Sequence, residues 1–410
     1  MMLNIIAALL ALVTPETSKL FEKRLESASG MVGYILKERI DFNQQSLYFT
    51  QKSMTDDGRF LVFESAPEDR TFAKQLAVID FEKDEIIPLE GIIRRTDNQM
   101  AYLDVEKDEV WYLDRGAFYK RELLKDPQAP VLVCKVPESL TIRGKIGRLF
   151  THLTLNHDRT KAYFDVSYAG GLMVQGLMDF SRGEFTEWSA NSDGKVINHG
   201  EINPVKDNLA LCAQEVTGDI KNIDGIYPRV QLNSLGKREV VECTMCNGGA
   251  THQTWAPDGK GYIYCGNGCT YHHLATDKEI EMIPGLYAAH ANLSLDNKYL
   301  VFDRQAEDDN WYRGCPWNVL FWNRLTGKYV FVYRNSAALN EKGAKHPLHP
   351  DPHPSFGCRD RYIICTFNDE ERRLNVFVAP VEQFILATQG ERADFSTYKR
   401  STSRKVTVFP

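Results

Sequence analysis

Three histidines and an aspartate gather near the C-terminal end of the chain, in the segment HPLHPDPHPSF that spans residues 346–356. His349, Asp351 and His353 alternate with prolines, which keep the backbone extended and stiff. Residues two apart in an extended chain lie on the same side, so these three side chains can face one partner. Imidazole nitrogens and a carboxylate oxygen suit Mn, Fe, Ni or Zn better than Cu(I). The segment therefore predicts a site for a divalent metal.

Other histidines recur at a fixed place relative to a set of polar turns. Seven such turns, each followed by a short run of apolar and aromatic residues, are spaced on average about 50 residues apart. Six residues before each turn residue stand, in chain order, Gln51, Ala101, His152, Glu201, His252, His290 and His353. Four histidines in seven places far exceed what ten histidines in 410 residues would give by chance. The position is therefore a structural one with a shared chemistry.

Units of this length that hold several strands are typical of β-propellers. We predict an all-β, seven-bladed β-propeller and prefer it to a two-domain β-sandwich, which needs no equal periods. The histidine position should begin the innermost strand of each blade, so equivalent residues should surround one end of the central axis. His252, His290 and His353, from three consecutive blades, should then converge, with His199 and Glu201 beside them. Polar residues that only satisfy strand ends are the alternative.

A converging group of imidazoles and carboxylates has two chemical uses. It can bind a divalent metal, and it can supply a general base near neutral pH. We expect His290 to join His349, Asp351 and His353 as metal ligands. His272 and His273 lie outside the repeated position and are expected at the surface.

Composition and the N-terminal residues limit the remaining possibilities. The net charge of −6 excludes a general binder of nucleic-acid phosphates. The apolar run at residues 5–13 is too short to span a bilayer, and it is either a signal-like segment or the start of a helix. Thr14-Pro15 then predicts a short helix that runs to about Gly30. We expect an N-terminal segment at 1–30 and one propeller domain at 31–410, in either the cytoplasm or the periplasm.

Cysteine spacing leaves a second metal site open. Cys243 and Cys246 form a C-x-x-C pair, which is compatible with zinc. Cys212, Cys265 and Cys365 instead lie within apolar, strand-like runs, which favours buried, reduced thiols. We prefer the second interpretation.

Six segments of the sequence carry a resemblance to a known family: QQSLYFTQKSMTDDGRFLVF, INHGEINPVKDNLALC, YPRVQLNS, THQTWAPDGKGYIYC, AAHANLSLDNKYLVFD and HPDPHPSFGCRDRYIICTF. Through them the chain resembles the oligogalacturonate lyases, a family of pectin-degrading β-propellers. These segments cover most of the span from about residue 30 to about residue 385. The histidines at the blade starts and the final Pro-His-Pro-Ser-Phe make the resemblance specific.

The resemblance implies a metal ion, usually manganese, and β-elimination on short uronate oligomers. By position, His290 and His353 match metal-binding histidines, His252 matches the proposed base, and Arg229 matches an arginine that contacts the substrate carboxylate. The family's last-blade motif is Gln-x-x-His-x-His, whereas this chain has Leu348 and Asp351 at the first two places. His349 is the candidate replacement, and Zn, Ni or Fe remain alternatives to Mn. Gln44, Gln45 and Ser46 stand where relatives tend to carry a histidine.

These residues define an expected reaction and its alternatives. His252 would take the C5 proton, with His199 as a second candidate, and Arg229, Arg304 and Tyr312 would bind the substrate. A lyase or glycosidase for another uronate glycan, such as a rhamnose–glucuronate linkage, is one alternative, and a non-catalytic propeller that binds a sugar or a protein is another. A serine-peptidase propeller is excluded because the chain has no G-x-S-x-G motif. The oligomeric state stays open.

Overall fold

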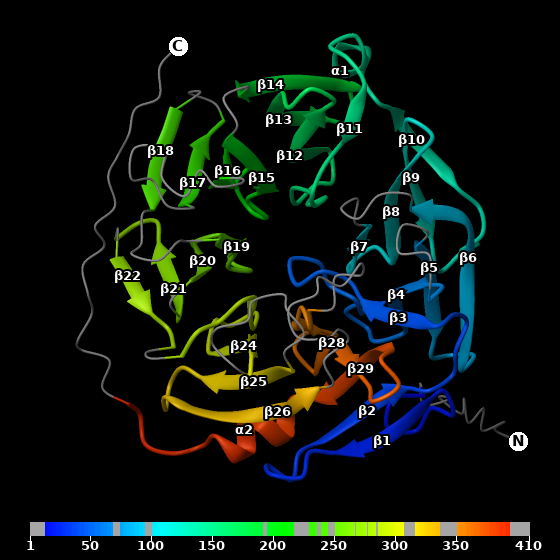
Figure 1. The fold of residues 1–410 in the computed structure, drawn as a ribbon, viewed down its shortest axis with the longest axis vertical. Coiled ribbons are helices and arrows are strands. Elements are labelled where there is room, and N and C mark those ends of the chain that lie inside the picture. The colour runs from blue at the N-terminus through cyan, green and yellow to red at the C-terminus, as the bar shows by residue number, and fades with distance from the viewer. Residues whose placement is uncertain are drawn as a thin grey trace, which may run out of the picture.

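Seven antiparallel sheets stand in a ring around a common axis in the computed structural model of the chain (Figure 1). The structure describes residues 13–68, 74–94, 101–191, 195–216, 229–235, 239–244, 251–266, 268–276, 278–283, 286–306, 316–336 and 351–393. Each sheet has at least four strands, and we number the blades in chain order from the sheet that begins at residue 43. The predicted all-β, seven-bladed propeller is confirmed.

The strands of each blade follow one another outward from the axis, apart from those of the last blade. The inner strands are β3 (Asn43–Ser46), β7 (Tyr102–Asp104), β11 (Ile146–Arg148), β15 (Lys195–Ile202), β19 (Thr251–Trp255), β23 (Ala291–Leu293) and β27 (Ser355–Gly357). The second strands are β4 (Phe60–Ala66), β8 (Glu109–Asp114), β12 (Lys161–Tyr168), β16 (Leu209–Val216), β20 (Gly261–Gly266), β24 (Tyr299–Gln305) and β28 (Tyr362–Asn368). Each predicted polar turn lies between the inner strand and the second strand of its blade.

The outer half of each blade completes the sheet. The third strands are β5 (Lys74–Asp80), β9 (Ala117–Glu122), β13 (Met173–Asp179), β17 (Arg229–Ser234), β21 (Gly268–His273), β25 (Trp317–Asn323) and β29 (Leu374–Pro380). The outermost strands of the first six blades are β6 (Glu85–Arg94), β10 (Val131–Lys135), β14 (Glu184–Asn191), β18 (Glu239–Thr244), β22 (Lys278–Glu281) and β26 (Lys328–Ser336). Two short helices, α1 (Glu138–Thr141) and α2 (Glu382–Ala387), lie outside the sheets.

The seventh blade closes the ring with strands from both ends of the chain. Its order is β1 (Phe21–Leu25), β2 (Val32–Leu36), β29, β28 and β27, so the blue N-terminal strands lie beside the orange C-terminal ones in Figure 1. Arg334 of β26 adds an ion pair to Glu26, with Nε 3.2 Å from Oε1. The pairing of β2 with β29 joins residues more than 300 positions apart in the sequence and makes the ring continuous.

The predicted N-terminal helix over about residues 14–30 is wrong. Residues 15–20 form turns, and Phe21–Leu25 is strand β1. A cap signal is a weak local preference, and here the free edge of the last blade supplies backbone partners that a lone helix would lack. An expected domain boundary at residue 30 therefore falls between two strands of one sheet. Residues 1–12, which carry most of the signal-like run, lie outside the described residues.

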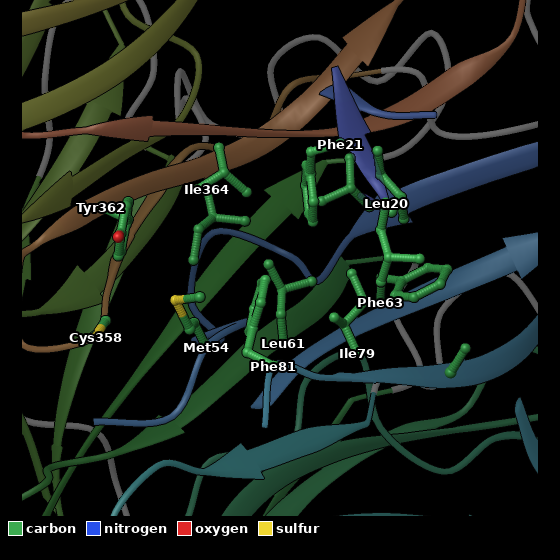
Figure 2. Packing of buried hydrophobic residues seen from close by; sticks show 14 residues of the cluster. Leu20, Phe21, Met54, Leu61, Phe63, Ile79, Phe81, Cys358, Tyr362 and Ile364 are labelled. Carbon is green, nitrogen blue, oxygen red and sulfur yellow. The ribbon is translucent and has the colours of Figure 1, made fainter. Parts of the chain in front are cut away.

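Apolar side chains fill the spaces between neighbouring blades. Figure 2 shows one such cluster, in which Leu20 and Phe21 from the N-terminal segment pack with residues of the first and the seventh blade. The middle strands β25 and β28 are buried along their whole length, which explains why their sequences are continuous apolar and aromatic runs. Cys212, Cys265 and Cys365 are buried reduced thiols, as predicted, and none of them forms a disulfide with another described residue.

The closing strand β2 provides a test of this architecture. Leu36 is fully buried in the cluster between the last and first blades, whereas Leu25 of β1 is 61% exposed. We expect Leu36→Ala to lower the free energy of unfolding by about 2–5 kcal/mol, because it leaves a cavity in a packed interior. Leu25→Ala should change it by less than about 0.5 kcal/mol. Denaturant unfolding of both variants measures the difference, and equal values would contradict the closure.

Two further sequence expectations meet the structure here. His272 lies within β21, is buried and stacks on Tyr262 with ring centroids 5.1 Å apart, so its predicted surface position is wrong. Strand alternation turns His272 inward, a feature that an isolated His-His pair does not reveal. Among the described residues, no helix has the length and apolar character needed to cross a membrane.

Candidate active site

Five histidines and one tyrosine form a closed circle at the axis of the propeller. We call them the histidine–tyrosine cluster: His152, His199, His252, His290, His353 and Tyr48. Successive ring centroids around the circle are 4.6, 5.7, 4.2, 4.4, 4.4 and 4.4 Å apart, starting from His152–His199 and ending at Tyr48–His152. The cluster takes one member from every blade except the second. The predicted convergence of His252, His290 and His353 is therefore found, and His199 joins them.

The backbone is bent at three of these histidines. His199, His252 and His353 have φ angles of 54°, 49° and 48°, in the left-handed region that side chains other than glycine seldom adopt. The strand register shifts between Asn198 and Glu201 and between Thr251 and Thr254. Such bulges re-aim a side chain out of the regular strand alternation. The fold thus holds these imidazoles toward the axis at a cost of about 1–3 kcal/mol each.

His290, Asp351 and His353 form the candidate metal centre. One ligand atom from each lies within 4.8 Å of the other two, and all three side chains are buried. His353 Nε2 is 3.8 Å from Asp351 Oδ2. Within the described part of the chain, His290 Nε2 is buried and has no hydrogen-bond partner. Burial in a dry site lowers the pKa of His290 well below its ordinary value, so its ring is neutral and has a lone pair to offer.

Asp303 on β24 holds both histidines of this centre. Its Oδ1 accepts the backbone N–H of His290 at 2.8 Å, and its Oδ2 accepts that of His353 at 3.0 Å. The Nδ1 atom of His290 lies 3.0 Å from Oδ2 and 3.1 Å from Oδ1. Burial raises the pKa of Asp303 to about 8, and the backbone N–H donors oppose that shift. The carboxyl group of Asp303 therefore fixes the His290 ring with Nε2 directed at the metal centre, the usual arrangement behind a metal-binding imidazole.

His252 lies next to this centre with a defined tautomer. Its Nδ1 is 2.8 Å from the carbonyl oxygen of Ala289, which can only accept, so Nδ1 carries the proton. The basic nitrogen is then Nε2. The ring centroid is 4.2 Å from that of His290. A proton acceptor and a candidate metal ligand are thus in van der Waals contact.

Burial favours the neutral form of two titratable residues, His152 of the cluster and Glu201 of β15. Burial and then the neighbouring imidazole of His199 lower the pKa of His152 well below the ordinary histidine value. Burial raises the pKa of Glu201 to about 8, although Thr254 donates a hydrogen bond to its Oε2 at 3.2 Å. At neutral pH, Glu201 is therefore mainly protonated and does not act as an anionic ligand.

Solved structures supply the comparison for this arrangement. The chain shares its fold with the oligogalacturonate lyases. It matches an oligogalacturonate lyase in complex with manganese at a TM-score of 0.68 and 19% identity, over 88% of this chain and 96% of that one. It matches an oligogalacturonate lyase from Vibrio parahaemolyticus at a TM-score of 0.62 and 16% identity, over 89% and 97% of the two chains. No protein-family model and no curated protein matches the sequence.

Other predicted site residues are only partly placed. Arg229 begins β17, but its side chain lies outside the described residues, as do Tyr312 and His349. Arg304 is half-buried on β24, where its Nε donates to the carbonyl oxygen of Gln305 at 3.3 Å. It directly follows Asp303, so the two side chains leave opposite faces of the sheet. A substrate contact by Arg304 stays a prediction.

The sequence did not predict Tyr48 as a site residue, and it placed Asp303 only among residues that line the mouth of the channel, without its role behind His290. Asp303 follows a run of apolar residues in β24, and only the fold reveals that it reaches across to the next blade. Tyr48 lies in the segment between β3 and Met54, which leaves the regular strand before an isolated bridge from Met54 to Leu61 restores the pairing. Residues 47–53 break the alternation of apolar and polar residues, and this break is the sequence feature that could have indicated the irregular segment.

The role of Asp303 can be measured without a substrate. We expect Asp303→Asn to weaken manganese binding by about 10–100-fold, because the variant no longer fixes the tautomer and orientation of His290. Asp80→Asn is the matched control, since Asp80 is equally buried but pairs with Arg59 at the end of β5. Calorimetric titration of metal-free protein with Mn²⁺ gives both affinities. Unchanged affinity in Asp303→Asn would show that His290 needs no such support.

Proposed function

We propose that the chain is a divalent-metal-dependent lyase that cleaves uronate oligosaccharides, of the oligogalacturonate kind, by β-elimination. The observation that carries the proposal is the contact between His252 and the His290–Asp351–His353 group at the axis of the propeller. A shared fold with oligogalacturonate lyases supports it. β-Elimination needs a base at C5 and neutralisation of the adjacent carboxylate, and these residues offer both functions at one place.

The residues fit a divalent cation. His290 Nε2 is a buried nitrogen without a hydrogen-bond partner among the described residues, and Asp351 adds a carboxylate beside His353. Nitrogen and oxygen donors without thiolate suit Mn²⁺, and also Zn²⁺, Ni²⁺ or Fe²⁺. Manganese is our first choice because one of the matched lyases is in complex with it. His349 is a further candidate ligand. When bound, the cation supplies Lewis-acid neutralisation of a uronate carboxylate.

The chain's own residues would then carry the proton. His252 Nε2 accepts the C5 proton, and the carbonyl oxygen of Ala289 on the Nδ1 side stabilises the imidazolium that forms. Arg229 is the candidate for a bidentate pair with the uronate carboxylate. His199 stacks 5.7 Å from His252 and is the second candidate for proton transfer.

A substrate panel tests the proposal. Manganese-loaded protein is incubated with di- and trigalacturonate and with a rhamnose–glucuronate disaccharide, and ultraviolet absorbance of the unsaturated uronate is followed. Elimination creates this chromophore, whereas hydrolysis yields reducing sugar without it. We expect absorbance with the oligogalacturonates. Absorbance with the rhamnose–glucuronate substrate alone would move the activity to another glycan, and no product with any member would favour a binding propeller.

A further inference from the structure

Tyr48 occupies a place in the circle that the repeat would leave empty. In the repeated histidine position, the first blade carries Gln51 and the second carries Ala101, and both are buried. Gln51 Nε2 donates to the carbonyl oxygen of Leu153 in the third blade at 2.9 Å, so its amide is already engaged. Ala101 has only a methyl group and contributes no ring to the circle. Tyr48 fills the gap, with its ring centroid 4.4 Å from both His353 and His152.

The segment that carries Tyr48 is held by a dedicated set of buried hydrogen bonds. Ser53 Oγ accepts the backbone N–H of Leu47 at 3.0 Å, and the carbonyl oxygen of Tyr48 accepts that of Gln51 at 2.7 Å. From the sixth blade, Asn292 Nδ2 donates to the carbonyl oxygen of Phe49 at 3.1 Å. The segment thus leaves its sheet and is fixed by hydrogen bonds to the third and sixth blades. These buried bonds hold the Tyr48 ring in one position at the axis.

The proposed reaction also needs a proton donor on the leaving side. Of the six rings, His290 and His353 are assigned to the cation and His252 to the C5 proton. His152 is neutral, and both of its ring nitrogens are buried without hydrogen-bond partners among the described residues. His199 lies beside His252, where a second positive charge would be repelled by the imidazolium. The hydroxyl of Tyr48 can donate a proton without first becoming a cation.

We propose that Tyr48 is a catalytic residue that donates its phenolic proton to the departing glycosidic oxygen; this rests on the function proposed above. As His252 Nε2 takes the C5 proton, the C5–H electrons form the C4=C5 double bond. The C4–O4 bond breaks, and O4 takes its electron pair and the Tyr48 proton. The departing sugar leaves as a neutral hemiacetal. The proton on His252 then returns to the Tyr48 phenolate through solvent, so the cycle needs no further reactant.

Leaving-group dependence tests this role. Tyr48→Phe is assayed on digalacturonate, which expels a sugar, and on galacturonate carrying a 4-O-nitrophenyl ether, which expels a nitrophenolate that needs no protonation. We expect kcat on digalacturonate to fall by about 10²–10⁴-fold. The loss on the aryl ether should stay below 10-fold, as should any change in Mn²⁺ affinity. Tyr362→Phe is the control, since Tyr362 contacts Glu16 at 3.1 Å in the cluster between the last and first blades.

The outcomes separate this proposal from the function on which it rests. Equal losses on both substrates would mean that Tyr48 only shapes the site, and no loss on digalacturonate would mean that another group donates the proton. Either result overturns the assignment while wild-type cleavage still supports the lyase. If His199→Gln, and not Tyr48→Phe, lost activity on digalacturonate but kept it on the aryl ether, His199 would be the proton donor. Wild-type protein that cleaves neither substrate would overturn the lyase and the assignment together.

Discussion

Replacing His252 by glutamine is expected to lower kcat for uronate cleavage by about 10²–10⁴-fold, the usual contribution of a positioned general base. Glutamine keeps a polar side chain of similar length but has no nitrogen that can take a proton at neutral pH. Nε2 of His252 is the group that is lost, because Nδ1 is engaged with the carbonyl oxygen of Ala289. Initial rates of absorbance increase on digalacturonate measure the change.

Two control measurements distinguish loss of the base from an indirect effect on the site. Bound manganese should be unchanged in His252→Gln, since His252 is not in the His290–Asp351–His353 group. His157→Gln is the matched histidine control, because His157 is exposed and faces Asp207 on the outside of a turn. Full activity in His252→Gln would remove this residue from the reaction and leave His199 as the base.

The ring of blades and the histidine circle were predictable because both follow from repetition. Each polar turn lies between the inner and the second strand of its blade, so the residue six positions earlier lies at an equivalent place near the axis in every blade. His252, His290 and His353 came together on this argument alone, without any knowledge of side-chain direction. The manner of their convergence was not predictable. Left-handed φ angles at His199, His252 and His353, with bulges at the first two, turn the rings inward, and neither feature has a residue-type signal here.

The residues that escaped prediction act between blades. Asp303 belongs to the second strand of the sixth blade but binds backbone N–H groups that precede the inner strands of two blades. Strand β1 pairs in the blade that ends near residue 380, far beyond the reach of a local helix signal. Tyr48 of the first blade completes the circle where the second blade contributes only Ala101. In each case the partner is distant in sequence, so local propensity and spacing carry no information about it.

A functional interpretation of the strained histidines follows from these contacts. Left-handed φ angles at three of the five cluster histidines cost stability, and none is needed to form a propeller. The rings of these three histidines all lie in the histidine–tyrosine cluster, where each contacts its neighbours. Backbone strain at residues whose side chains meet at one site is typical of positions selected for chemistry and not for packing.

Joint replacement of His290 and His353 by alanine is expected to abolish metal binding. It removes two of the three donors in the described centre and leaves Asp351 alone, which is too few for a tight site. Elemental analysis of protein purified without chelator should find about one Mn, Zn, Ni or Fe per wild-type chain and none in the variant.

Thermal unfolding gives a readout of this loss that is independent of catalysis. Binding to the folded state at 100 times the Kd adds about 2.7 kcal/mol of stability, so wild-type protein should unfold at a higher temperature with added Mn²⁺. The double variant should show no such shift, whereas His152→Ala, in the same circle but outside the metal group, should keep it. Retention of stoichiometric metal in the double variant would place the ion elsewhere. Since His252 needs a neutralised uronate carboxylate beside it, an ion bound elsewhere would leave Arg229 as the residue that neutralises the carboxylate.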